Sequence, residues 1–165
     1  MGEREMEKMV EQAFRRMTRL CSRGEYCVFD IRQKLRGMDL SEEEKEAVIQ
    51  KLKEGRFIDE ARYARSFIGD KLRFNRWGRK KIELVLHQKQ LPGEIIEQAF
   101  MEFSEEELSA SLPGLLKKKW PTVTGASAYE KEGKLIRFAL GRGFSMEEIR
   151  LCLDQLKKEG VWNDE

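Results

Sequence analysis

The side chains that most often carry out chemistry are scarce in this sequence. Its 165 residues include one histidine, His87, and three cysteines, Cys21, Cys27 and Cys152. An odd number of cysteines without a CxxC pair, beside a single histidine, offers neither a disulfide framework nor a zinc site. The GxSxG, GxxxxGKS/T, HExxH and GxGxxG motifs are missing, and no carboxylate pair stands beside a histidine. We therefore assign no catalytic residue, no metal and no cofactor, and expect a protein that is not an enzyme.

The chemistry that remains is electrostatic, and it is concentrated in the middle of the chain. The segment from Arg62 to Lys89 contains only two acidic residues, Asp70 and Glu83. Its nine basic residues are Arg62, Arg65, Lys71, Arg73, Arg76, Arg79, Lys80, Lys81 and Lys89. Solvated surfaces normally mix both signs, so we interpret this segment as functional. Phe74 and Trp77 stand among the cations, a mixture that suits a phosphate backbone with base stacking and equally an acidic protein groove with an aromatic anchor. For the two aromatic rings themselves, we expect packing under the helix turn.

Basic residues of the last third of the chain, among them Arg137 and Arg142, extend this surface in our interpretation. The candidate partner-binding residues are Arg62, Arg65, Arg73, Arg76, Trp77, Arg79, Lys80, Lys81, Lys89, Arg137 and Arg142. The net charge of the whole chain is only +2, with a pI near 8.4, which weighs against strong autonomous DNA binding. Acidic residues crowd the expected helix starts after Ser41 and Pro92, where they complement the helix dipole.

The elements that position these residues are predicted to be helices. Only three prolines interrupt the chain, 38% of the residues are charged, and apolar residues recur at helical spacing. No apolar run approaches the roughly 20 residues that span a bilayer. We expect an all-α protein of the cytoplasm with reduced cysteines and no membrane contact, and a monomer, since no heptad stripe is long enough for a coiled coil.

An internal repeat of about fifty residues organises these helices. One apolar residue can be taken as the reference position, or anchor, of each copy: Leu40, Leu91 and Phe144. Apolar residues recur nine and five positions before each anchor and eight, nine and twelve positions after it. Each anchor is followed by a helix-starting residue, and Ser41 and Ser145 each have a glutamate three positions later, the spacing of a capping box. The pattern predicts a helix on either side of each anchor.

Each copy has room for one further helix at its start, at residues 3–21, 59–73 and 104–119. The prediction is three tandem three-helix repeats, at 1–57, 58–104 and 105–165, that form an elongated, curved molecule. Pro113-Gly114 should kink or shorten the first helix of the third repeat, and a loop of about ten residues should follow it. We expect Gly55 to end a helix in the left-handed region and Asp59 to cap the next one, and residues 160–165 repeat this boundary pattern.

The stretch LKEGRFIDEARYARSF, from Leu52 to Phe67, resembles the signature of the bacterial RecX family, the regulators of RecA recombinase. The segment 79–91 resembles the family's basic second helix, and the segment 134–145 resembles its third-repeat segment, which ends in Arg-Gly-Phe-Ser. One departure is Gln90, which stands where the family usually has glycine. We expect this helix to end without the left-handed cap that glycine provides.

The resemblance implies a non-enzymatic protein, most simply an inhibitor, that binds the RecA filament on DNA. It would lie along the filament groove and restrain filament growth, ATP hydrolysis and strand exchange in homologous recombination, DNA repair and the SOS response. DNA would be contacted weakly or through the filament. Two alternatives stay open: a sequence-neutral single-stranded nucleic-acid-binding helical protein, and a helical scaffold for an unrelated acidic protein.

Overall fold

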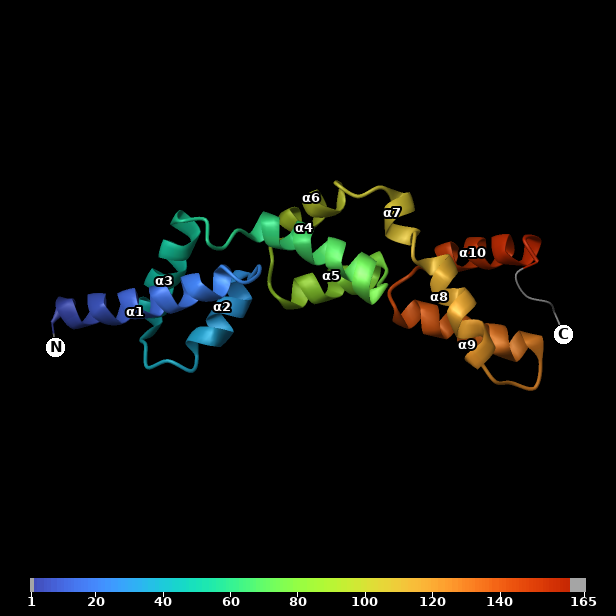
Figure 1. The fold of residues 1–165 in the computed structure, drawn as a ribbon, viewed down its shortest axis with the longest axis horizontal. Helices are drawn as coiled ribbons and strands as arrows, with labels where there is room; N and C mark the ends of the chain where they lie inside the picture. The colour runs from blue at the N-terminus through green and yellow to red at the C-terminus, as the bar shows by residue number, and fades with distance from the viewer. Residues whose placement is uncertain (1, 161–165) are drawn as a thin grey trace. The chain divides into compact units, whose positions relative to one another are not determined.

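The computed structural model describes residues 2–160, and over these residues the secondary structure is entirely helical (Figure 1). The first repeat contains α1 (Glu3–Cys21), α2 (Val28–Leu35) and α3 (Glu42–Glu54). The second contains α4 (Glu60–Asp70), its π-helical continuation η1 (Lys71–Asn75), α5 (Arg79–Gln88) and α6 (Gly93–Phe100). The third contains α7 (Glu105–Ser109), α8 (Leu112–Lys119), the 3-10 turn η2 (Trp120–Thr122), α9 (Ala128–Gly141) and α10 (Met146–Lys158). The all-α class with helical repeats is confirmed.

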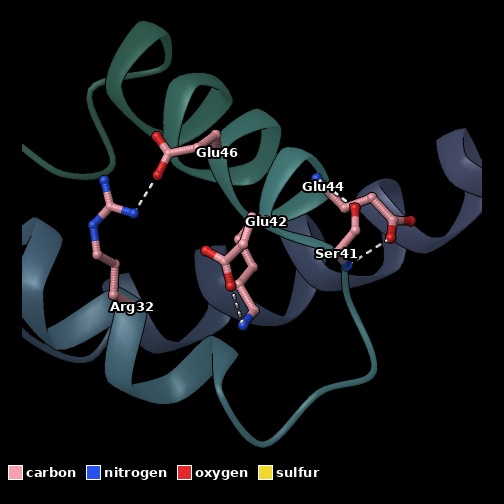
Figure 2. A network of polar contacts seen from close by, with 6 residues as sticks. Arg32, Ser41, Glu42, Glu44 and Glu46 are labelled. Atoms are coloured by element: carbon pink, nitrogen blue, oxygen red, sulfur yellow. Dashed lines mark hydrogen bonds and ion pairs between the residues drawn. The ribbon is translucent and has the colours of Figure 1, made fainter.

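The predicted helix starts are confirmed at atomic level. In α3 the Ser41 hydroxyl accepts from the Glu44 amide at 3.1 Å, and the Glu44 carboxylate accepts from the Ser41 amide at 2.8 Å (Figure 2). The same reciprocal pair starts α10, between Ser145 and Glu148, at 3.1 and 3.0 Å. Each box satisfies two amide groups that the helix leaves unpaired. Figure 2 also shows the ion pair that joins Arg32 of α2 to Glu46 of α3.

The repeat positions form the core. Nine residues before each anchor, Ile31, Ile82 and Leu135 are all 0% exposed. The residues five positions before the anchors, Leu35, Leu86 and Ala139, are also 0% exposed. A spacing of four residues keeps both positions on one helix face, so each repeat buries the same apolar stripe.

The first helix of the third repeat is broken, as the sequence predicts. It splits into the short helix α7 and the helix α8, and Pro113 lies in the first turn of α8, where its missing amide costs nothing. The 3-10 turn η2 and a segment without helix follow before α9 begins at Ala128. The repeated boundary pattern of residues 160–165 reaches from Gly160 into Val161–Glu165, which lie outside the described residues.

Among the described residues, three helices are followed by a non-glycine residue with left-handed backbone, and two sequence expectations are corrected there. Gly55 has φ −83°, and the left-handed residue after α3 is Arg56, with φ 58°. Gln90 has φ 62°, so α5 does end in a left-handed residue although glycine is absent. After both helices, a backbone amide donates a hydrogen bond to a carbonyl five or six residues earlier in the chain. One example is the Phe57 amide, which donates to the carbonyl of Leu52 at 2.9 Å. These closing hydrogen bonds select the left-handed conformation over the preference of the side chain.

The described residues form two compact units. One holds the chain up to Ser66 together with Leu86–Ala99, and the other holds Phe67–Val85 together with the chain from Phe100 on. The unit boundaries fall inside α4, inside α5 and before the last residue of α6, and they do not coincide with the predicted ends of the repeats. The repeat boundaries at 57/58 and 104/105 remain predictions.

Candidate functional site

Trp77 is the centre around which the basic segment is organised. The Nζ atoms of Lys71 and Lys81 lie 4.8 and 4.5 Å from its ring centroid, one from each neighbouring helical segment. The ring of Phe67 meets it edge to face with centroids 6.5 Å apart. The Trp77 amide donates to the carbonyl of Lys71 at 3.1 Å and closes the wide π-helical turn. Trp77 is half-buried, which confirms the packing expectation for this ring.

The packing expectation for Phe74 is wrong. Its side chain is 77% exposed. The residues 71–75 form a π-helical turn, and Arg76 then takes a left-handed backbone with φ 55°, which reverses the chain. This reversal brings Trp77, and not Phe74, against Phe67. Phe74 is left as an exposed aromatic ring between two exposed cations, Arg73 and Arg76.

A glycine contact brings the third repeat to this segment. The Gly78 amide donates to the carbonyl of Arg142 at 2.7 Å, and the Lys80 amide donates to the carbonyl of Gly143 at 3.1 Å. A Cβ on Gly78 would lie 2.6 Å from the carbonyl carbon of Gly143, so the two backbones touch without side chains between them. The Arg142 guanidinium donates to the carbonyl of Asn75 at 3.0 Å. These contacts place Arg142 beside the basic segment, and its predicted role in a partner-binding surface stays a prediction.

We name the resulting group the Trp77 cluster. It consists of Lys71, Arg73, Phe74, Arg76, Trp77, Lys80, Lys81 and Arg142. Its members come from η1, the turn before α5, the first turns of α5 and the end of α9. The arrangement can bind anions through several cations while offering Phe74 as a flat apolar face.

Three of the sequence-predicted residues of the second and third repeats, Arg65, Arg79 and Arg137, are not members of the Trp77 cluster. Arg79 donates to Glu83 one turn later at 2.7 Å, and its guanidinium lies 4.6 Å from the ring centroid of Phe100. Arg137 is exposed on α9 and lines a separate hollow between α9 and α10 with Tyr129 and Arg150. Neither side chain has a described contact with the side chains of the Trp77 cluster. Arg65, the next candidate, is exposed on α4.

Arg62 is held inside the fold of the first unit. Its Nε donates to the Glu25 carboxylate at 2.8 Å, and its two terminal nitrogens donate to the carbonyls of Arg56 and Phe57 at 3.1 and 3.2 Å. These carbonyls follow the end of α3, where the helix leaves acceptors unpaired. The Arg62 amide in turn donates to Asp59 at 3.0 Å, which confirms Asp59 as the cap of α4. The structure thus gives Arg62 a role in joining α3 to α4.

Lys89 is also held by the fold, in a polar network between α2, α4 and the end of α5. Its Nζ donates to Asp30 at 2.8 Å and lies 5.6 Å from the ring centroid of Tyr63. Burial lowers the pKa of Lys89, but the hydrogen bonds to Asp30 and Tyr63 outweigh it and raise the pKa above its ordinary value. Burial raises the pKa of Asp30, and the hydrogen bonds from Lys89 and the Cys27 amide more than reverse this, so the pKa is lowered. Asp30 and Lys89 are therefore a charged pair at neutral pH.

Glu60 completes this network from the start of α4. Its carboxylate accepts from the Val28 amide, the first residue of α2, at 2.9 Å. Burial raises the pKa of Glu60, and it also raises the pKa of the fully buried Cys27 thiol to about 11. A thiol with this pKa is protonated and unreactive at neutral pH. Several residues of the stretch 52–67, which resembles the family signature, therefore have a structural role: they connect the helices of the first repeat to α4.

Sequence reasoning missed the exposed ring of Phe74 and the pairing of Gly78 with Gly143. Glycines beside helices are common, so neither glycine stands out in the sequence. Their contact joins two residues 65 positions apart, and the repeat pattern does not indicate that these two residues meet. In the part of the chain that the structure describes, no group of His, Cys, Asp and Glu is arranged to hold a metal ion. No helix among these residues is long and apolar enough to cross a membrane.

Comparison with known proteins places these features in a family. Residues 59–99 match the model of the second three-helix domain of RecX, and residues 105–153 match that of the third. The chain is 33% identical to the regulatory protein RecX of Prosthecochloris aestuarii over 129 residues, which are 77% of this chain and 82% of the relative. It is 26% identical to the regulatory protein RecX of Haemophilus influenzae strain PittEE, over 92% of this chain and 99% of the relative.

Solved structures agree on the fold. A crystal structure of regulatory protein RecX superposes with a TM-score of 0.81 at 23% identity, over 93% of this chain and 80% of the other. RecX from Lactobacillus salivarius superposes with a TM-score of 0.74 at 21% identity, over 92% of this chain and 98% of the other. The two matched three-helix domains, the identity to a relative that is matched over most of its length, and the shared fold lead to one conclusion: the chain belongs to the RecX family of regulatory proteins.

Proposed function

We propose that this protein is a non-enzymatic regulator, in the inhibitory sense, of the RecA recombinase. It binds the RecA filament on DNA and restrains filament growth, ATP hydrolysis and strand exchange, and so acts in recombination, DNA repair and the SOS response in the cytoplasm. Membership of the RecX family carries the regulatory role. The Trp77 cluster is the observation that supports a polyanionic partner, which in a RecA filament is either acidic protein surface or DNA phosphate.

The cluster is suited to such a partner because its charges are not cancelled locally. Arg73, Arg76 and Lys80 are exposed, and the described ion pairs of the chain involve none of them. Lys71 and Lys81 contact the Trp77 ring through their ammonium groups. A cation over an aromatic face keeps its full charge. We propose the cluster as the main contact, with Arg65, Arg79 and Arg137 as secondary contacts.

A repeat protein needs no deep pocket to regulate a filament. Weak contacts distributed over several repeats add through effective concentration when the partner is itself a repeating polymer. A molecule that bridges successive RecA subunits would change their geometry or prevent the next subunit from adding. This inhibits the filament without any chemical step and requires no cofactor, and a monomer suffices.

The test is the ATPase activity of single-strand-bound RecA from the same organism, measured while the protein is added at sub-stoichiometric ratios. The triple variant Arg73→Glu, Arg76→Glu, Lys80→Glu should need at least tenfold more protein for half-inhibition, which corresponds to about 1.4 kcal/mol. The matched control reverses three exposed cations of α1, Arg4, Lys8 and Arg16, and changes the net charge by the same amount. Equal inhibition by the two triple variants would show that the cluster is not the contact.

The alternative of direct binding to single-stranded nucleic acid is favoured by one observation, the exposed ring of Phe74 among cations. A base can stack on such a ring while phosphates meet the neighbouring arginines. This alternative predicts binding to a single-stranded oligonucleotide without RecA, weakened steeply by salt and by Phe74→Ala. Inhibition of RecA that survives Phe74→Ala, with no oligonucleotide binding in 150 mM salt, would reject it.

A further inference from the structure

The third repeat carries a groove that the Trp77 cluster does not use. It runs between α8 and α10, is bordered by α7 and Arg79, and has a volume of about 780 Å³. Figure 1 shows these helices in yellow, orange and red. Along α10 and the residue that caps its end, lining residues recur every four positions, at Glu147, Leu151, Gln155 and Glu159. This stripe covers twelve residue steps, or about 18 Å at 1.5 Å per residue. We call this hollow the α8–α10 groove.

The floor of the groove is apolar. Leu112 of α8 and Leu156 of α10 belong to the buried core of the third repeat, at 1% and 2% exposed. Beside them Leu151 is 66% exposed and Cys152 is half-buried. Leu151 therefore offers an exposed apolar contact point inside the hollow, which a partner's aliphatic side chain can cover.

The rim of the groove carries an excess of negative charge. Glu105, Glu147 and Glu159 are exposed carboxylates that line it. Of the two lining cations, Arg79 is already paired with Glu83, which leaves Lys117 to balance the three. A carboxylate rim repels phosphate and attracts lysine and arginine. The groove therefore differs in sign from the Trp77 cluster, and a nucleic acid does not fit it.

We infer that the α8–α10 groove binds a basic amphipathic helix of a partner protein. About three turns of helix match its length, with apolar side chains at i, i+3, i+4 and i+7 against Leu151 and Cys152. Lysine or arginine residues beside this stripe pair with Glu105, Glu147 and Glu159. The inference goes beyond the proposed regulation of RecA, because it concerns a second surface of opposite charge and holds or fails independently of the first.

The probe is a fluorescein-labelled, 15-residue synthetic peptide of leucine and lysine in the pattern of an amphipathic helix. Fluorescence anisotropy should show saturable binding, and a peptide with glutamate in place of every lysine should not bind. Leu151→Arg should weaken binding at least tenfold. The control is Leu140→Arg, at a leucine of α9 that is 41% exposed and does not line the groove, and it should leave binding unchanged. Because both leucines are exposed, neither variant should unfold the protein.

A second measurement locates the peptide. In a Cys21→Ser background, Cys27 is fully buried and Cys152 is the thiol that lines the groove. Its alkylation by N-ethylmaleimide should slow at least threefold when the leucine-lysine peptide is saturating, and a single-stranded oligonucleotide should not slow it. Absence of peptide binding, equal binding to Leu151→Arg and Leu140→Arg, or binding without protection of Cys152 would each overturn the inference.

Discussion

Replacement of Lys89 by methionine tests whether this cation holds the fold or meets a partner. In the structure the Lys89 and Asp30 side chains are 25% and 20% exposed and their charged atoms lie 2.8 Å apart. Methionine keeps the length of the lysine stem but removes the charge, so Asp30 loses its ionic partner and retains the Cys27 amide at 3.3 Å. A half-buried carboxylate that loses a charged hydrogen-bond partner costs about 2 kcal/mol, less than a fully buried pair would.

The assay is urea unfolding followed by far-UV circular dichroism. With a denaturant dependence of about 2 kcal/mol per molar urea, a loss of about 2 kcal/mol lowers the unfolding midpoint by about 1 M. Asp30→Asn and the double variant complete a cycle, and we expect a coupling of at least about 1 kcal/mol between the two positions. The control Lys80→Met removes an exposed cation of the Trp77 cluster and should shift the midpoint by less than about 0.25 M.

The reasoning is refuted if Lys89→Met unfolds at the same urea concentration as the wild-type protein. In that case the contact seen between Lys89 and Asp30 contributes no stability. If RecA inhibition is at the same time weakened, the sequence prediction that Lys89 meets a partner is the better one. A stability loss with unchanged half-inhibition in the ATPase assay, below the unfolding range, supports the structural role.

Three further predictions follow from backbone conformation and from charge. Gln90→Gly should raise the melting temperature by about 1–2 °C. Glycine accepts the left-handed backbone at φ 62° without the roughly 1–2 kcal/mol that a side chain costs, and its greater entropy in the unfolded chain offsets part of this gain. The control Gln88→Gly, at the last residue of α5, should lower the melting temperature. Gly78→Ala should lower stability by about 2 kcal/mol in thermal unfolding, since its Cβ would meet backbone at 2.6 Å, whereas Gly114→Ala meets nothing within 4 Å and should not destabilise. The difference in stability between the wild-type protein and Lys89→Met should shrink as the pH falls below about 4. The pKa of Asp30 is lowered in the folded state, so the stability that its charge contributes is lost when it is protonated. Urea unfolding midpoints at about pH 7 and about pH 3 measure this.

Periodic and local features could be predicted from the sequence. Buried residues recur at fixed offsets from each anchor, and Ile31 and Leu135 occupy the same place in their repeats because each helix must bury one stripe. Helix starts are equally local, since Ser41 and Glu44 satisfy each other within four residues. The break before Pro113 follows from the covalent structure of proline.

Contacts between distant parts of the chain could not be predicted. A charge count treats Arg62 and Lys89 like their neighbours, but their carboxylate partners Glu25 and Asp30 stand 37 and 59 positions away. The exposure of Phe74 depends on a wide π-helical turn, for which no sequence rule exists. Local rules therefore define the helices, and long-range pairing decides which cations remain available to a partner.

The contact between Gly78 and Gly143 has a consequence for how proteins of this kind can change over evolutionary time. A joint made of main-chain atoms is indifferent to the side chains that surround it. The side chains of Arg76 and Lys80, which flank the joint, can be exchanged for others while these main-chain hydrogen bonds stay in place, whereas the Arg142 guanidinium adds a hydrogen bond of its own to the carbonyl of Asn75. Only the two glycines are fixed by geometry. If the surface of a partner changes during evolution, the binding residues can therefore change with it while the main-chain contact between the two repeats is kept. The same property allows new binding side chains to be introduced by design.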